Sequence, residues 1–164
     1  MSNKNRILHN DHKVAMIDID HDHVIEMGDF VFIAIAADVS DDATITLGYG
    51  IPATDLVDAG SAADNRVTMA AQLLGIALQP SPSGDNDEKI AVGYNGTFIL
   101  DQKTGAAIHI GDNIEIYSAD PNADDQAIVE GDTSIIAKCI KTKTTTTAVT
   151  EVQALVQPAL MNVA

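Results

Sequence analysis

The residues best equipped for chemistry lie in one short stretch, Asp18–His23, where carboxylates alternate with other side chains. Successive side chains of a β-strand point to opposite faces, so Asp18, Asp20 and Asp22 would share one face. Three carboxylates on one face can hold a hard cation such as calcium. The histidines at positions 21 and 23 would lie on the other face, where they can contribute to a zinc site.

The spacing within Asp18–His23 matches no established metal motif, even with His9 and His12 nearby. A polar turn that ends the first strand accounts for the same residues. We therefore predict no metal ligands in this stretch, and a metal site is the alternative.

A second acidic stretch imitates a calcium-binding loop, because Asp120, Asn122 and Asp124 have the spacing of its first ligands. The sixth loop position needs glycine for a sharp turn, and here it is Asp125. The twelfth position needs a bidentate glutamate, and here it is Gly131. The pattern predicts an acidic surface loop rather than an EF-hand, with a loosely bound surface calcium as the alternative.

Motifs of known active sites are absent from the sequence. It contains no G-x-S-x-G, no P-loop, no G-x-G-x-x-G and no H-E-x-x-H. The single cysteine, Cys139, has no second cysteine to pair with and no neighbouring Cys/His motif, so we interpret it as an apolar strand residue. We predict a protein that is not an enzyme, with no catalytic residues and no cofactor.

The net charge of the chain limits the classes of partner that it can bind. The 164 residues include 24 acidic and 9 basic ones, which gives a formal net charge of −15. A field of that sign repels phosphate backbones and anionic membranes, so we expect no direct contact with nucleic acid or membrane. The longest apolar run, Phe30–Ala37, has the length of a strand, and the N-terminus lacks the apolar stretch of a secretory signal.

Short apolar runs separated by Gly, Pro, Asn and Asp predict strands over most of the chain. Only Asn65–Leu74 has the composition of a helix, with Gly75 as its expected C-cap. Asn95-Gly96, between two apolar runs, is the strongest hairpin signal. The predicted strands are Val14–Ile19, Phe30–Ile35, Thr44–Leu47, Gly75–Gln79, Lys89–Val92, Gly96–Leu100, Asn113–Tyr117, Ser134–Lys141 and Val149–Leu155.

These elements predict an all-β fold, either a small β-barrel or a β-clip-like sandwich, with at most one or two short helices and an extended N-terminal arm. We expect an arm over residues 1–13, a single β domain over residues 14–157 and a C-terminal tail over residues 158–164. Four Gly-Asp pairs recur along the chain, and we interpret them as turns rather than as an internal repeat. They begin at Gly28, Gly84, Gly111 and Gly131.

Several of these runs together resemble a family of small tailed-phage proteins found beside capsid genes, the capsid decoration (cement) or head-fibre-like proteins. The family pattern is an L-G-V-A run, a charged linker, V-x-V-x-x-x-G-x-F, G-D-x-V-Y and a strand that begins I-G or I-A. An early G-D-x-V element precedes it. The matching segments are Gly28–Val31, Leu74–Ala77, Lys89–Val92, Gly96–Leu100, Gly111–Tyr117 and Ile135–Lys138.

The resemblance implies a structural virion protein that is made in the bacterial host cytoplasm and stabilises the outer surface of a phage capsid. Its implied partners are the major capsid protein and two further copies of itself in a homotrimer. One alternative is another virion role, such as a minor head protein, a fibre base or an adhesin-like module. A β-barrel binding module is a second alternative. The long N-terminal region and the insertion at Thr54–Asn65 depart from the family pattern.

The N-terminal segment is the candidate for partner binding. Lys4 and Arg6 place positive charge at the tip of an acidic chain, where it can steer the arm to a carboxylate-rich patch. Ile7 and Leu8 would supply the apolar anchor of the contact. We expect this arm to contact the shell or an adjacent subunit rather than the protein's own core; a frayed terminus is the alternative.

Overall fold

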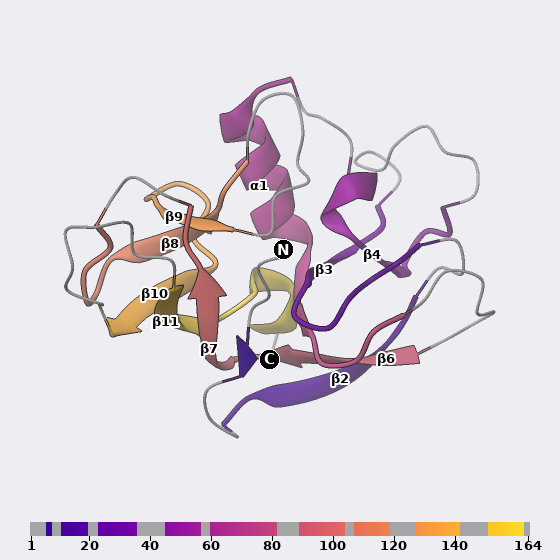
Figure 1. The fold of residues 1–164 in the computed structure, drawn as a ribbon. Coiled ribbons are helices and arrows are strands. Elements are labelled where there is room, and N and C mark those ends of the chain that lie inside the picture. Colours follow the sequence, from indigo (N-terminus) through magenta and orange to yellow (C-terminus); the bar gives the residue numbers. More distant parts are fainter. Residues whose placement is uncertain are drawn as a thin grey trace.

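The computed structural model describes residues 6–7, 11–19, 23–35, 45–56, 60–81, 89–103, 107–118, 127–141 and 151–162. Strands dominate this part of the chain, with one short α-helix, which confirms the predicted all-β class (Figure 1). None of the described helices is long and apolar enough to cross a membrane. The strands are β1 (Arg6–Ile7), β2 (Lys13–Asp18), β3 (Phe30–Ile33), β4 (Gly50–Ile51), β5 (Leu73–Ala77), β6 (Lys89–Tyr94), β7 (Gly96–Asp101), β8 (Asn113–Ile116), β9 (Ile128–Glu130), β10 (Ala137–Lys141) and β11 (Glu151–Val156). The helices are η1 (Ala53–Asp55), α1 (Ala62–Gln72) and η2 (Ala159–Asn162).

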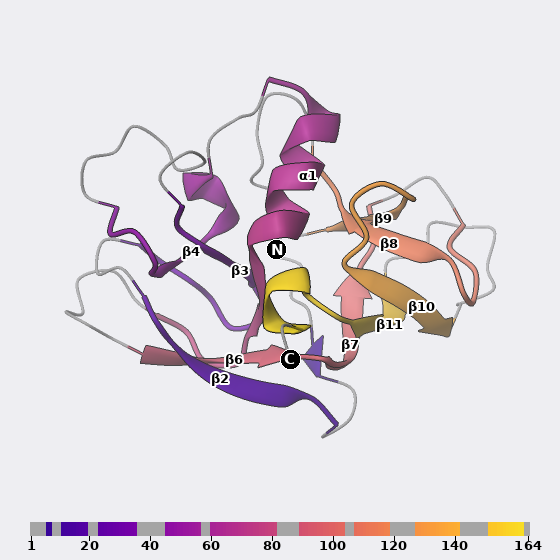
Figure 2. The ribbon, with the colours of Figure 1, turned by 180° about the vertical axis from the view of Figure 1, so that it is seen from behind.

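The strands form two antiparallel sheets that lie side by side, with α1 near their junction (Figures 1 and 2). The strand order is β1-β7-β11-β10-β8-β9 in one sheet and β2-β6-β5-β3-β4 in the other. Among the described strands neither sheet closes into a barrel. Of the two predicted architectures, the structure is consistent with the sandwich.

The two sheets repeat one five-stranded unit. Without β1, the order β7-β11-β10-β8-β9 follows β2-β6-β5-β3-β4 strand for strand along the chain. The first strand of each unit pairs along its whole length with the last, Lys13–Asp18 with β6 and Gly96–Asp101 with β11. We call residues 13–94 unit 1 and residues 96–156 unit 2.

An isolated parallel bridge occurs at the same place in both units. In unit 1 the residue after β2, Ile19, bridges to Gly50 of β4. In unit 2 the residue after β7, Gln102, bridges to Ile128 of β9. The two edges of each sheet therefore curl toward each other and meet at a single bridge. In unit 1 glycine permits this approach, because a Cβ on Gly50 would lie 2.5 Å from Ile19 Cδ1.

A Gly-Asp turn leads into β3 of unit 1. Gly28 has a φ of +97°, which favours glycine, and Asp29 Oδ2 accepts a hydrogen bond of 2.8 Å from the Glu26 N–H. The turn is held against β5, because the Gly28 N–H donates to the Ala77 carbonyl and the Ala77 N–H donates to the Asp29 carbonyl. This turn fixes where β3 begins.

The turn that leads into β8 of unit 2 makes the same bonds. Gly111 has a φ of +92°, and Asp112 Oδ2 accepts a hydrogen bond of 2.6 Å from the His109 N–H. The Gly111 N–H donates to the Cys139 carbonyl, and the Cys139 N–H donates to the Asp112 carbonyl. The interpretation that the Gly-Asp pairs mark no internal repeat is therefore wrong for these two pairs, which occupy equivalent positions in two equivalent units.

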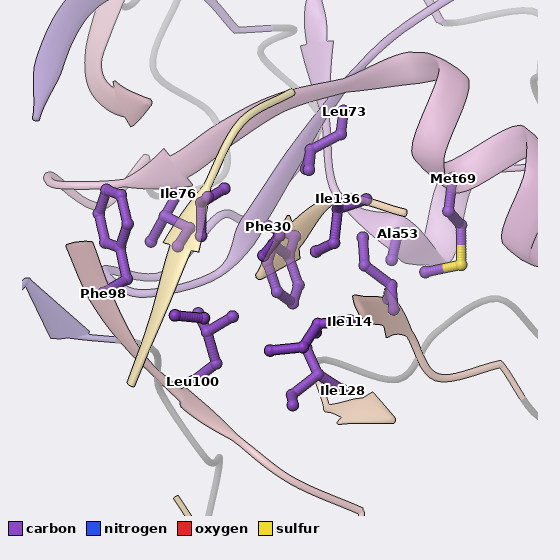
Figure 3. Packing of buried hydrophobic residues seen from close by; sticks show 14 of the residues in the cluster. Phe30, Ala53, Met69, Leu73, Ile76, Phe98, Leu100, Ile114, Ile128 and Ile136 are labelled. Carbon is purple, nitrogen blue, oxygen red and sulfur yellow. The ribbon is translucent and has the colours of Figure 1, made fainter. Parts of the chain in front are cut away.

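The apolar interiors follow the repeat as well. One buried cluster lies within unit 1. The larger cluster combines the interior of unit 2 with residues of unit 1 and α1, so both units share one core (Figure 3). Cys139, 2% exposed, takes the place that Ala77 has in unit 1, in agreement with the predicted apolar strand residue. The equivalent interior pairs are Ile17 and Leu100, Ile25 and Ile108, Val31 and Ile114, Leu74 and Ile136, Ile90 and Val152, and Val92 and Ala154.

The helix α1 is an insertion in unit 1, since the shorter connection from β9 to β10 in unit 2 contains no helix. Its first turn is capped by Ser61, whose Oγ accepts a hydrogen bond of 3.2 Å from the Asp64 N–H. The helix was expected to end at a Gly75 cap, and this is wrong. It ends at Gln72, and Gly75 lies inside β5, where a Cβ would collide with the Gly93 carbonyl of β6.

The predicted hairpin at Asn95-Gly96 is also wrong. Asn95 does have a positive φ, +48°, but β6 and β7 on either side of it belong to different sheets. The pair makes the corner between the two units. Gly96 is required by close packing, because a Cβ there would collide with His12.

The remaining strand predictions differ in detail. Residues 45–47 of the predicted Thr44–Leu47 strand are not in a strand, and β4 and β9 were not predicted. Both missed strands are short, with two and three residues, so alternation gives little signal. β10 begins at Ala137 rather than at Ser134.

The two ends of the chain are held to the fold where they are described. Arg6–Ile7 form β1 on the edge of β7, so this part of the expected arm over residues 1–13 pairs with the protein's own sheet. At the other end, residues 158–162 were expected as a tail. Pro158 is buried there, and Met161 of η2 packs against the apolar cluster of unit 1.

Candidate functional site

The repeat makes the outer edges of β2 and β7 comparable, because both are the first strand of a unit and lie at the same place in their sheets. β1 pairs with the β7 edge through Arg6 with Ile99 and Ile7 with Phe98. Asp11 adds to this cover, accepting hydrogen bonds from the Thr97 N–H at 3.2 Å and the Thr97 hydroxyl at 3.0 Å. Thr97 is 5% exposed as a result.

The β2 edge has no such cover among the described residues. β2 is the terminal strand of its sheet and pairs only with β6 (Figures 1 and 2). Val14 and Met16 point to the same face and are 50% and 57% exposed. At the end of the strand Asp18 forms an exposed ion pair with Lys89, with an Oδ1–Nζ distance of 3.0 Å. This edge is an open apolar strip on an acidic protein.

The Gly-Asp turns present a second pair of exposed apolar side chains. Met27 precedes Gly28 and is 58% exposed, and Ile110 precedes Gly111 and is 70% exposed. Ile140, 41% exposed, follows Cys139, the residue to which the second turn is bonded. Met27 and Ile110 thus hold equivalent exposed places on two turns with the same backbone bonds.

The stretch Asp18–His23, where a metal site was the alternative, takes part in separate interactions in the residues that the structure describes. Asp18 pairs with Lys89, Ile19 is in the unit 1 core, and His23 Nδ1 lies 2.7 Å from Asp55 Oδ2. His12 packs against the Phe98 ring with centroids 6.0 Å apart. No group of three or more metal-ligating side chains is found within the described ranges.

Eight other positions considered as metal ligands lie outside the described residues. They are His9, Asp20, His21, Asp22, Asp120, Asn122, Asp124 and Asp125.

The most buried acidic group with a defined environment is Glu115 of β8, which is 3% exposed. Its Oε1 accepts hydrogen bonds from the backbone N–H groups of Thr133 and Ser134 at 2.5 and 2.7 Å. Its Oε2 lies 3.7 Å from Arg66 Nη1 of α1. A Cβ on Gly131 would collide with this carboxylate, so the loop closes tightly over it. Glu115 thus anchors the connection from β9 to β10 and the helix.

Tyr117, beside this anchor, is flanked by two cations. Lys103 Nζ lies 4.5 Å from the centre of its ring, and the Arg66 guanidinium carbon lies 6.0 Å from it. Both distances suit cation–π attraction. The Arg66 contact ties unit 2 to α1, the Lys103 contact lies within unit 2, and we interpret both as structural.

The predicted partner-binding residues are only partly described. Arg6 and Ile7 form β1, whereas Lys4 and Leu8 lie outside the described residues. Sequence reasoning missed the β2 edge and the turn tips. Signals existed for both, in the apolar residues Val14 and Met16 of the first strand and in an apolar residue before each of two Gly-Asp pairs.

Comparison with protein-family models gave no match, and comparison with curated proteins gave no significant match.

Proposed function

We propose that this protein is a structural virion protein that binds the outer surface of a phage capsid and stabilises it. The observation that carries the proposal is the pair of equivalent Gly-Asp turns, each with an exposed apolar side chain at its tip. Met27 and Ile110 are held on turns whose backbone bonds are the same in both units. The backbone at these anchors is already held by hydrogen bonds, so docking orders only their side chains, which lowers the entropy cost.

The segments that carry the family resemblance contribute to both units. Leu74–Ala77 and Lys89–Val92 contribute to β5 and β6 of unit 1. Gly96–Leu100 contributes to β7, and Gly111–Tyr117 contains the second turn and β8 of unit 2. The resemblance therefore rests on the parts that define the repeated fold.

The acidic side chains with described partners also fit a structural role. Asp29, Asp112 and Glu115 each accept hydrogen bonds from backbone N–H groups and so fix turns and loops. The net charge of −15 favours partners with basic surfaces and opposes contact with nucleic acid. We propose the major capsid protein as the partner, with three copies of this protein clustered on the shell.

The test uses capsid particles prepared without this protein. Purified protein is added back, bound protein is quantified after sedimentation of the particles, and cryo-electron microscopy locates it. We expect saturable binding on the outer surface and a higher disruption temperature of the particles. Met27→Asp and Ile110→Asp together should weaken binding at least tenfold, whereas Val67→Asp, at an exposed site on α1 (49% exposed), should leave it unchanged. Absence of binding by the wild-type protein would refute the proposal.

A further inference from the structure

The edge of β2 that no described residue covers supports an inference that does not depend on the proposed function. Each chain has two equivalent edges, β2 in unit 1 and β7 in unit 2, but one β1 segment to cover them. β1 covers β7. An uncovered strand edge presents unpaired N–H and carbonyl groups and is a template for pairing with another chain.

The repeat also shows which backbone groups of β2 point to this edge rather than to β6. In β7 the Thr97 N–H points away from β11, because it donates to Asp11 at the outer edge. Val14 is the equivalent of Thr97, since both are the second residue of the first strand. Outward-pointing groups alternate along an antiparallel strand, so those of Val14 and Met16 face the open edge. The residues whose backbone groups point to this edge are thus also those with exposed apolar side chains.

We propose that this edge binds a second copy of the chain, with β2 of each copy pairing antiparallel across a two-fold axis. The outward backbone groups of the two β2 edges then hydrogen-bond to each other. If β1 of one copy paired with β2 of another copy instead, β7 of the first copy would lose its cover. A continuous sheet of ten strands, five from each copy, results.

The side chains select the register. A two-fold axis perpendicular to the sheet keeps equivalent faces together, so only residues of the same face can be opposite each other. Pairing Val14 with Met16 of the second copy places both exposed apolar side chains of each copy against apolar neighbours, with Ala15 opposite Ala15 at the axis. A shift of two residues in one direction pairs Val14 with the charged Asp18, and a shift in the other direction pairs Met16 with His12. Either shift leaves one apolar pair in place of two, which is less favourable.

The overall charge opposes this association, because two copies of net charge −15 repel each other. Salt screens that repulsion but does not weaken the apolar contact. Dimerisation of the free protein should therefore strengthen as ionic strength rises. The pairing uses only the β2 edge, so it leaves the turn tips available to a shell.

Sedimentation equilibrium of the full chain tests the proposal. We expect a monomer–dimer equilibrium that Val14→Lys weakens about tenfold or more, because both apolar pairs of the dimer lose a member. Val67→Lys on α1 is the matched control, since Val67 is 49% exposed and Val14 is 50% exposed. Both substitutions reduce the net negative charge equally, so a loss of dimer specific to Val14→Lys cannot come from repulsion.

A covalent test fixes the register. With Ala15→Cys, mild oxidation should produce a disulfide-linked dimer, because paired residues without hydrogen bonds across an antiparallel ladder lie about 4.5 Å apart at Cα. Cys139 is buried, and Ile110→Cys, 70% exposed on unit 2, serves as the control for random cross-linking. A monomer at all concentrations, or an oligomer indifferent to Val14→Lys and unlinked by Ala15→Cys, would overturn the proposal while leaving capsid binding to its own test.

Discussion

Units 1 and 2 have the same strand order, the same Gly-Asp turn and the same parallel bridge, yet their side chains differ at most positions. Unit 1 has an inserted helix and an open first strand. No helix occurs in the described residues of unit 2, and its first strand is covered by β1. The shared features are backbone bonds that define the fold, whereas the differing features are surfaces. Exposed apolar side chains occur both where the units agree, at the two Gly-Asp turns, and where they differ, at the edge of β2.

One pair of equivalent positions shows how far the side chains diverge. Phe32 of β3 and Glu115 of β8 each pair with the neighbouring short strand at the same place. Phe32 fills the core shared by the units, while Glu115 is buried under the loop at 133–134 and beside Arg66. A carboxylate replaces an aromatic ring because backbone N–H groups are present to satisfy it.

The largest effect on stability is expected from substitutions at equivalent positions of β5 and β10. Gly75 and Ala137 occupy equivalent positions, opposite Val31 and Ile114. A Cβ on Gly75 collides with the Gly93 carbonyl, so Gly75→Ala should lower the free energy of unfolding by about 3 kcal/mol. Ala137→Gly should cost only about 1 kcal/mol. Urea unfolding of both variants measures the difference; equal losses would mean that the two sites are not packed differently.

The next largest effect is expected when the edge of β7 is uncovered, so that it resembles the edge of β2. Deleting residues 1–12 removes β1 and Asp11 from the β7 edge, so hydrogen bonds to Ile99 and Thr97 are lost. We expect a loss of about 1–2 kcal/mol, or about 3–6 °C in the melting temperature. Calorimetry of the truncated and full-length chains measures it. An unchanged melting temperature would show that β1 adds nothing to the fold.

The smallest effect tests whether the turns are equivalent in energy as well as in geometry. Asp29→Ala and Asp112→Ala each remove a carboxylate that accepts a backbone N–H, and each should cost about 1 kcal/mol. Conservative Asn variants should recover part of the loss, because the amide oxygen can accept the same bond. A marked inequality between the two alanine variants in chemical unfolding would argue against equivalent roles.

The sequence predicted the fold class, because alternation and turn residues are local signals. Most strands were placed within a few residues, and the helix was placed approximately. The repeat was missed because only a few equivalent residues are identical. Asp18 and Asp101 are one such identical pair, and Ile25 and Ile108 are another. The inserted α1 also disturbs the spacing between later strands. Repeated backbone geometry leaves little trace in the sequence when each interior is filled by different apolar side chains.

Pairing between distant segments was the least predictable feature. Asn95-Gly96 looked like a hairpin because its local signal is the same whether the next strand turns back or starts a new sheet. The candidate site shows the same limit. Exposure of Val14 and Met16 depends on β2 being an edge strand, and cover of β7 depends on pairing with residues far away in the chain. Neither follows from residue spacing.

Amide hydrogen exchange at low protein concentration compares the covered edge of β7 with the open edge of β2. We expect slow exchange at Thr97, whose N–H is bonded to Asp11, and fast exchange at the equivalent Val14. Asp11→Ala should make Thr97 exchange faster, because Asp11 accepts its N–H, and leave Val14 unchanged. Equal exchange at Thr97 and Val14 in the full-length monomer would contradict the account.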